Sequence, residues 1–452
     1  MFLSALDMLV PTHQSSGLWR HPDAEPEQYR DLDFWVSHAR MLDEAGFDAL
    51  FLADVAGIYD VYGGSGAAAI RAGMQYPLLD PMLLISALAA ATRHLGFGVT
   101  ANTSYESPYL LARRFATLDQ LTGGRIAWNI VTGYQPGALR NIGAPELDHD
   151  TRYDRADEFA EVCYALWEGS IEPGALVSDA ESGVYMDPAK VHPIEHRGEW
   201  FDVPGAAVSL PGPQRTPFLF QAGSSPRGLA FAARHAEALF FSGTTPDNVA
   251  PLVAEARRLL AGEGRADSEL TTITSVTAIA AETDAAAFER YESYLRYVDR
   301  EAALALFAGW TGLDLSTYGP DDVLEDVEIQ GNRSALQSFT SLDPTRRWTV
   351  GDLAAHMTIG GRGPVFVGSG ATIADELERW LRESGVDGFN VDYALRGPDM
   401  RAFAEHVVPV LRARGLVSAE DSIDDAAPRT LRARVAGSDL LPATHPAAKY
   451  RR

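Results

Sequence analysis

The stretch Phe218-Leu219-Phe220-Gln221-Ala222-Gly223-Ser224-Ser225-Pro226-Arg227-Gly228 contains the unit from which the fold can be derived. It begins with a short apolar run, typical of a β-strand that is buried on both faces. The strand runs into a Gly-Ser-Ser turn, where Ser225 suits a helix N-cap and Pro226 suits the first helical position. A strand that leads directly into a helix is half of a βαβ unit, so this stretch predicts an α/β protein with a parallel sheet.

Similar apolar runs recur on both sides of this stretch, and amphipathic helical segments lie between most of them. The predicted strands are Leu3–Met8, Ala49–Ala53, Leu95–Ala101, Ile126–Val131, Phe218–Ala222, Ala238–Phe241, Thr271–Ala280 and Gly388–Val391. The predicted helices are Leu32–Ala45, Pro81–Thr92, Pro108–Leu121, Tyr153–Trp167, Pro226–His235, Asn248–Ala261 and Ala374–Ser384. Eight strands alternating with helices predict a (β/α)8 TIM barrel, although a doubly wound open sheet fits the same alternation.

Two intervals are too long to be simple connections between a strand and a helix. Residues 169–216 are rich in Gly and Pro and include an expected hairpin around Val191–Val203, and residues 283–364 include an aromatic-rich helix. We expect a single barrel domain over residues 1–417 with these two insertions. The polar segment 418–452 lacks clean periodicity, and we expect a tail that is extended or bound to a partner.

Composition excludes several classes of protein and binding site. The chain has 452 residues, a net charge of −24 and one cysteine, Cys163, which cannot form an intrachain disulfide or a cysteine-based zinc site. So acidic a surface repels phosphodiester backbones and anionic lipid, which argues against nucleic-acid and membrane partners. Because the first residues lack a basic and apolar leader pattern, we expect a cytoplasmic protein.

Polar side chains follow most of the predicted strands, at the end where barrel enzymes place their active sites. They are Asp54, Thr100, Asn102, Asn129, Thr132, Gln221, Ser224 and Ser242. A rim of amides and hydroxyls with one carboxylate suits hydrogen bonding to a planar heterocycle better than it suits a metal ion. We therefore expect no metal site. Polar loops that merely meet strand ends would give a similar pattern.

The Ser224-Ser225-Pro226 turn adds a candidate phosphate site. Free backbone N–H groups at the start of the helix, two hydroxyls and the helix dipole bind phosphate without needing a lysine, and Arg227 could add positive charge. An ordinary capped helix is the alternative interpretation.

Histidines occur at three other places of interest. His149 lies four residues before Tyr153, so both face one side of a helix, and two aspartates flank the histidine. After the first strand, His13 and Trp19 could line the mouth of a substrate site. His192 and His196 have a spacing seen in metal sites, but we interpret both as structural because no third ligand lies near them in the sequence.

The sequence contains no Gly-x4-Gly-Lys-Ser/Thr phosphate loop, no Gly-x-Ser-x-Gly elbow and no His-Glu-x-x-His pair. The glycines near Gly368 do not complete a dinucleotide fingerprint. Serine-hydrolase, zincin and Rossmann interpretations therefore lose their main support.

Several of these stretches resemble the bacterial luciferase-like flavin monooxygenases, in the branch of the nitrilotriacetate, dibenzothiophene-sulfone and dimethyl-sulfide enzymes. The stretches that carry the resemblance are Gly46–Asp54, Ser107–Arg125, Trp128–Thr132, His149–Phe159, Gly183–Trp200 and Gln221–Arg227. The resemblance covers nearly the whole chain up to about Gly415.

The resemblance implies a luciferase-like barrel that binds reduced FMN supplied by a separate flavin reductase, with O2 activated as a flavin C4a-hydroperoxide that oxygenates a small, organosulfur-type substrate. It implies FMN contacts at Asp54, Thr100, His149, Tyr153, Ser224 and Ser225. It also implies that the catalytic residue Asn129 lies near the flavin and oxygen, and that His13, also expected to be catalytic, and Phe51 face the substrate. Gly133 departs from the family pattern, which has a serine there.

Three functions remain open from the sequence: a two-component FMN-dependent monooxygenase, a deazaflavin-dependent oxidoreductase of the same fold, and a flavin-binding protein without catalysis. The long motifs favour the first of these. The insertion over residues 283–364 is a candidate lid that keeps water from the flavin, and a homodimer or homotetramer is expected. The substrate itself is not identified by the sequence.

Overall fold

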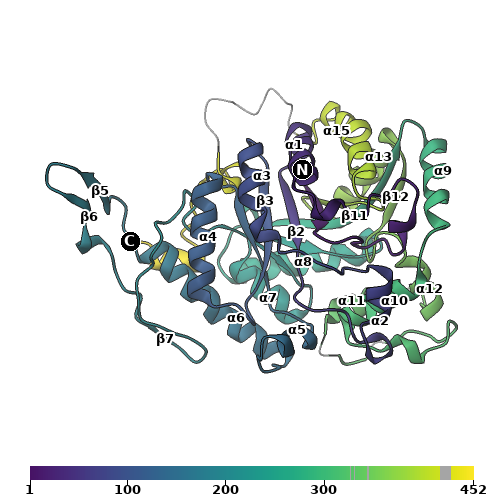
Figure 1. Cartoon of the computed structure of the whole chain (residues 1–452), viewed down its shortest axis with the longest axis horizontal. Coiled ribbons are helices and arrows are strands. Elements are labelled where there is room, and N and C mark those ends of the chain that lie inside the picture. Colours follow the sequence, from purple (N-terminus) through teal and green to yellow (C-terminus); the bar gives the residue numbers. More distant parts are fainter. Residues whose placement is uncertain (326, 330, 344–345, 418–428) are drawn as a thin grey trace.

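The computed structural model describes residues 1–325, 327–329, 331–343, 346–417 and 429–452. Its centre is a closed barrel of eight parallel strands surrounded by helices (Figure 1). In order around the barrel the strands are β1 (Phe2–Met8), β2 (Ala49–Ala53), β3 (Gly96–Asn102), β4 (Ile126–Val131), β9 (Phe218–Ala222), β10 (Ala238–Phe241), β11 (Thr271–Ala281) and β13 (Gly388–Asp392). Because β13 pairs with β1, the TIM barrel is confirmed and the open-sheet alternative is wrong.

All eight predicted strands are present, with ends that differ by at most one residue. The helices that cover the barrel are α1 (Leu32–Ala45), α3 (Ile85–Ala91), α4 (Pro108–Thr122), α6 (His149–Tyr164), α7 (Pro226–His235), α8 (Pro246–Gly262), α13 (Gly370–Ser384), α14 (Pro398–Ala402) and α15 (Val408–Ala413). Short helices α2 (Ala67–Ala72) and α5 (Pro136–Asn141) lie in the loops after β2 and β4. Across the described ranges no helix combines the length and apolar character that a membrane crossing needs.

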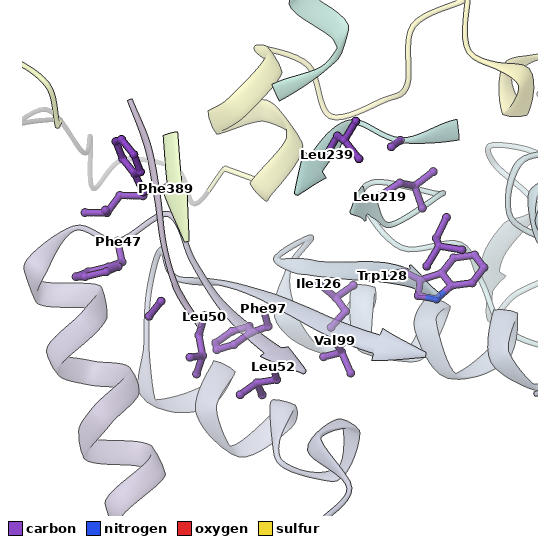
Figure 2. Close-up of a cluster of buried hydrophobic side chains, with 14 of the residues drawn as sticks. Phe47, Leu50, Leu52, Phe97, Val99, Ile126, Trp128, Leu219, Leu239 and Phe389 are labelled. Atoms are coloured by element: carbon purple, nitrogen blue, oxygen red, sulfur yellow. The ribbon is translucent and has the colours of Figure 1, made fainter. Parts of the chain in front are cut away.

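Two layers of apolar side chains stabilise the barrel. Outside it, Leu50, Leu52 and Phe97 pack between the strands and the helices, as Figure 2 shows. Inside it, Phe51 and Phe220 meet edge to face, with ring centroids 5.4 Å apart. Gly98 in β3 provides room for both rings, because a Cβ there would lie 3.1 Å from Phe51 and 3.3 Å from Phe220.

The first insertion extends away from the barrel as an arm (Figure 1). It holds the hairpin β5 (Leu176–Asp179) and β6 (Val184–Met186), followed by β7 (His196–Arg197) and β8 (Asp202–Val203). The β7–β8 pair confirms the hairpin expected around Val191–Val203, whereas β5–β6 was not expected.

The second insertion forms a cap over one side of the barrel mouth. It contains α9 (Asp284–Leu295), α10 (Arg300–Thr311), α11 (Arg333–Gln337) and α12 (Val350–His356). It leads into β12 (Val365–Ser369), which pairs in parallel with the carboxyl-terminal part of β11. The cap has its own hydrophobic cluster, which includes Leu306, Phe339 and Trp348. This cluster packs on Tyr59 and Met74 from the loop after β2. The aromatic-rich helix expected here is α9.

The expectation of an extended or partner-bound tail is wrong for residues 429–452, while residues 418–428 lie outside the described part of the chain. Residues 429–452 contain α16 (Leu431–Ala436), and they pack against the amino-terminal end of the barrel. Leu431 joins the cluster inside the barrel. Arg432 is 1% exposed and donates to Glu237 at 2.6 Å and 2.8 Å and to the carbonyls of Thr216 and Pro217. A buried, fully paired guanidinium holds this segment in place.

Candidate active site

A cavity of about 240 Å³ opens at the carboxyl ends of the barrel strands. Nine of the ten predicted site residues line it: His13, Phe51, Asp54, Thr100, Asn129, His149, Tyr153, Ser224 and Ser225. The cap over the barrel mouth supplies Trp310, Asn332, Arg333 and Arg362 to the wall. The site is therefore built by strand ends, by the loops after them and by the second insertion.

Trp19 is the predicted site residue that the structure does not bring to this cavity. It is 39% exposed and borders a separate shallow depression beside Tyr393 and Arg396. His13 lies close to the end of β1 and is buried, whereas Trp19 lies six residues further along the chain in a short 3-10 helix, Leu18–Arg20.

One end of the cavity is a cradle of hydroxyls and glycines. Ser225 caps α7 by accepting a hydrogen bond from the Gly228 N–H at 3.1 Å, and its Oγ lies 3.3 Å from His149 Nε2. The Tyr153 hydroxyl fills the space where a Cβ on Gly223 or Gly228 would lie, at 2.8 Å from each. Only glycine leaves room for this arrangement, so turn, helix start and tyrosine form one concave polar surface, typical of a phosphate site.

The sequence suggested that Arg227 adds positive charge at this end of the cavity, but the structure does not place Arg227 there. Arg227 does not line the cavity and pairs with Asp154 at 2.8 Å and Asp157 at 2.6 Å. Arg152 and Arg333 line the cavity instead. Burial lowers the pKa of His149, a hydrogen bond to Asp150 opposes that change, and Arg333 and Arg152 lower it further.

The floor of the cavity presents amide groups whose hydrogen-bonding capacity is only partly used. Asn129 Nδ2 donates to Thr100 Oγ1 at 2.8 Å, and Thr100 donates to the Leu52 carbonyl at 3.0 Å. The buried oxygens Asn129 Oδ1 and Gln221 Oε1 have no partner among the described residues. Because unpaired buried acceptors are costly, this floor fits a ligand that brings N–H donors, as a reduced isoalloxazine ring does.

Asp54 lies at the end of β2 with its carboxyl facing the cavity. Burial raises its pKa to about 7, and the negative charges of Asp80 and Glu106 act in the same direction, against a hydrogen bond from the Val55 N–H. Near neutral pH this carboxyl therefore exists in both protonation states, so it can donate or accept a hydrogen bond.

His13 and its neighbours form another wall of the cavity. His13 Nδ1 lies 3.3 Å from the buried carboxylate of Asp392, which orients the ring, and the Gln75 amide donates to the His13 carbonyl at 3.0 Å. Tyr59 Oη then donates to Gln75 Oε1 at 2.9 Å and lies 2.9 Å from Tyr134 Oη.

Sequence reasoning missed Tyr59, Tyr134, Gln135, Arg333 and Arg362, all of which line the cavity. The two arginines come from an insertion without strand or helix signals near them. The run Gly360-Gly361-Arg362-Gly363 was the one available signal, since closely spaced glycines mark a tight backbone approach. His192 and His196 bond to Glu172 and Glu158 on the first insertion and α6, away from the cavity.

Comparison with known proteins agrees with this architecture. The sequence matches the profile of the luciferase-like monooxygenase family over residues 8–388. A dimethyl-sulfide monooxygenase of Hyphomicrobium sulfonivorans is 46% identical over 99% of this chain and 93% of its own length. The crystal structure of DmoA from that organism has a TM-score of 0.91 at 45% identity, covering 100% of this chain and 96% of that one.

A long-chain alkane monooxygenase of Geobacillus thermodenitrificans is 40% identical over 99% of this chain and 97% of its own length. The other enzymes of the resembled branch also match. The dibenzothiophene-sulfone monooxygenase of Rhodococcus erythropolis is 36% identical over 90% of this chain and 91% of its own length. The nitrilotriacetate monooxygenase component A of Aminobacter aminovorans is 33% identical over 89% of this chain and 90% of its own length.

A riboflavin lyase whose crystal structure contains a modified FMN is also similar, with a TM-score of 0.92 at 37% identity and complete coverage of both chains. This relative, the family and the unpaired acceptors of the floor agree on flavin use. The relatives that are 40% and 46% identical over 99% of this chain are monooxygenases, which decides against the deazaflavin and non-catalytic alternatives. The chain belongs to the luciferase-like monooxygenase family and is a flavin-dependent monooxygenase.

Proposed function

We propose that this protein is the oxygenase component of a two-component system, which receives reduced FMN from a separate flavin reductase and uses O2 to oxygenate a small organic substrate. We favour an organosulfur substrate, because dimethyl-sulfide and dibenzothiophene-sulfone monooxygenases are among the relatives. The observation that carries the proposal is one cavity that joins a phosphate-type cradle to a floor with unpaired amide acceptors.

In this proposal Ser224, Ser225 and Tyr153 bind the phosphate of FMN, with positive charge from Arg152 and Arg333 nearby. Asn129 and Gln221 accept hydrogen bonds from the ring and so orient it, and Asp54 and Thr100 lie along the same floor. When bound, the reduced flavin supplies the electrons that activate O2.

The remaining residues prepare the substrate side. Phe51 and Phe240, whose ring centroids are 6.1 Å apart, provide an apolar surface in the cavity. His13, oriented by Asp392, presents its ring to the cavity, where it can form a hydrogen bond with the substrate or product. The cap over the barrel mouth keeps water out, which favours oxygenation over loss of hydrogen peroxide.

Replacing both hydroxyls of the cradle tests the cofactor site. In Ser224→Ala/Ser225→Ala we expect the dissociation constant for FMN, measured by anaerobic titration with the reduced form, to rise by about 10- to 100-fold, since bonds to a charged group are lost. Ser182→Ala on the exposed arm is the matched control and should bind like the parent protein. Unaltered affinity in the double variant would remove the assignment.

Oxygenation is tested with a flavin reductase, NADH, FMN and 18O2. A substrate should acquire one labelled oxygen atom while hydrogen peroxide release falls by an equal amount. If a panel of sulfides and sulfones all leave peroxide release unchanged, the organosulfur assignment is wrong. Incorporation of label into substrates of another class would then support the proposed monooxygenase activity and change only the proposed substrate class.

We also propose that the protein is a homodimer or homotetramer that works in the cytoplasm beside the reductase, because the reductase draws on a reduced nicotinamide. The arm formed by the first insertion supports self-association, since its β5–β6 hairpin exposes Val177 and Tyr185.

A further inference from the structure

Arg362 is a cation in the wall of the cavity that the cofactor site does not explain. It lies on the loop before β12, and its guanidinium carbon is 5.0 Å from the ring centroid of Trp310. No carboxylate of the described residues lies within ion-pair distance of it, in contrast to Arg227 or Arg396. Burial lowers its pKa to about 10, which still leaves the group charged at neutral pH.

The groups nearest to Arg362 do not neutralise it. Tyr134 and Tyr59 are its electrostatic neighbours, but burial raises the pKa of Tyr59 to about 12 and raises that of Tyr134 well above its ordinary value, so both are neutral phenols at pH 7. Arg362 is partly buried in the cavity wall, so a ligand in the cavity can reach its guanidinium. A ligand that brings the opposite charge would gain a charge-assisted hydrogen bond there, so this part of the wall favours an anion.

The position of Arg362 separates it from the phosphate cradle. Arg152 and Arg333 act on His149 at the cradle, whereas Arg362 acts on Tyr59 and Tyr134. Hydrogen bonds continue from those tyrosines toward the substrate side: Trp310 Nε1 donates to Tyr59 Oη at 3.2 Å, Tyr59 donates to Gln75, and Gln75 donates to the His13 carbonyl.

A second polar group on this wall is available to a ligand. Gln135 follows Tyr134, lines the cavity and is 7% exposed, and neither its Nε2 nor its Oε1 has a partner among the described residues. A donor such as Nε2 and a planar guanidinium together suit an oxyanion, which accepts hydrogen bonds from both. A hydrocarbon or a simple dialkyl sulfide would leave all of these groups unpaired.

Resting on the proposed function, we infer that Arg362 binds an acidic group of the substrate, and that this enzyme oxygenates small organic anions, carrying a carboxylate, sulfinate or sulfonate, in preference to neutral compounds. The neighbouring phenols and Gln135 complete the subsite, and the Trp310 ring holds the guanidinium in place. The two relatives at 46% and 40% identity are named for a neutral sulfide and for alkanes, and the relative at 33% identity is named for nitrilotriacetate, which is a polycarboxylate. The inference therefore rests on Arg362 and Gln135 and not on the names.

Matched pairs of compounds test the inference without any variant. A methylthio-alkanoate and its methyl ester share the sulfur centre and differ in charge. We expect the acid to bind the enzyme loaded with oxidised FMN at least 100-fold more tightly in calorimetry, and its kcat/KM to exceed that of the ester by a similar factor. Equal binding of acid and ester, or no binding of any acid in a panel of carboxylates, sulfinates and sulfonates at millimolar concentration, would overturn the inference.

Two variants then assign the effect to Arg362. Arg362→Met should weaken acid binding by about 100-fold and leave the ester unchanged, while Arg362→Lys should recover part of the loss because it keeps the charge. The dissociation constant for FMN should remain that of the parent protein in both. If FMN binding weakens as much as acid binding, the guanidinium serves the flavin and the inference is wrong.

The calorimetric measurement tests this inference separately from the proposed function. Arg362-dependent binding of an acid that is not oxygenated would retain the anion site and contradict the proposed reaction on that class. Oxygenation of neutral sulfides alone, without acid binding, would retain the reaction and contradict the anion site.

Discussion

Asp54 gives a pH-dependent prediction, because its pKa lies near neutral pH in the folded protein. Burial and two neighbouring acids raise its pKa to about 7 in the folded protein, so the folded state binds the proton more tightly than the unfolded chain does. The contribution of this group to stability is therefore most favourable at low pH and declines as the pH rises from about 4 to about 7.

We expect Asp54→Asn, which cannot ionise, to lack this decline. In urea unfolding of the FMN-free protein, the free energy of unfolding of the variant relative to the parent should rise by about 3 kcal/mol between pH 4.5 and pH 8, since one pKa unit corresponds to about 1.4 kcal/mol. Asp80→Asn removes a charge that raises the pKa of Asp54, so it should move the decline of the parent to lower pH. A difference between Asp54→Asn and the parent that does not vary with pH would contradict the raised pKa.

Among single residues, the sequence predicted those site residues whose role depends on neighbours close along the chain. Ser225 was predicted as a helix cap and a site residue because the cap, the turn and the hydroxyl lie within a few residues of one another. Arg362 was not predictable, because its importance depends on the absence of a carboxylate near it in space. Gly133 is an intermediate case, because the sequence showed a glycine where the family has a serine but did not show why. The structure gives the reason: Gly133 has a φ of +72°, and the amide nitrogen of Asn102 lies 2.6 Å from where a Cβ would be.

Among the elements, the cap over the barrel mouth is the one that we propose protects the reaction from water. Trp348 is buried within its hydrophobic cluster, 4.9 Å from the Phe339 ring, and does not line the cavity. Trp348→Ala should loosen the cap without touching the site, because large-to-small core changes typically cost about 3 to 5 kcal/mol locally.

We therefore expect Trp348→Ala to release more hydrogen peroxide per NADH consumed, by about two- to tenfold, while the dissociation constant for FMN changes little. Phe288→Ala is the matched control, because Phe288 is an exposed aromatic residue on α9 of the same insertion. Coupling in Trp348→Ala that equals coupling in the control would show that the cap does not protect the reaction from water.

Element prediction succeeded wherever an element carried its own signal. The barrel strands have apolar runs, and α1 carries an Asp31 cap and ends at Gly46, whose φ is +80°. The carboxyl-terminal segment also has a cap at Thr430 and a glycine end at Gly437, but α16 has only six residues and is too short to be stable alone. Its structure depends on Arg432 reaching Glu237, a contact 195 residues away along the chain that no local pattern contains.

At the scale of the whole molecule, a net charge of −24 opposes the approach of every anion that the proposed reaction uses. Residues inside the cavity must therefore attract anions against the negative charge of the whole protein. In our proposal the helix start with Ser225 and the nearby Arg152 and Arg333 attract the phosphate, and Arg362 attracts the substrate. Both groups of residues line the cavity, where short-range interactions are stronger than in bulk water.

The arm is the feature of the whole molecule that argues for more than one copy. Its β5–β6 hairpin pairs with no other strand of the described chain, and isolated two-stranded hairpins are marginally stable in water. Val177 and Tyr185 on this hairpin are 45% and 69% exposed, so a second copy that covered them would stabilise it.

In Val177→Asp/Tyr185→Asp we expect the assembly to dissociate, because two charges would be buried without partners. Light scattering after size exclusion at about 10 μM should give a dimer or tetramer for the parent and a smaller species for the variant. Leu83→Asp is the control, since Leu83 is 83% exposed on the barrel and should not affect the mass. A monomeric parent protein, or an unchanged mass in the arm variant, would show that the arm does not hold copies together.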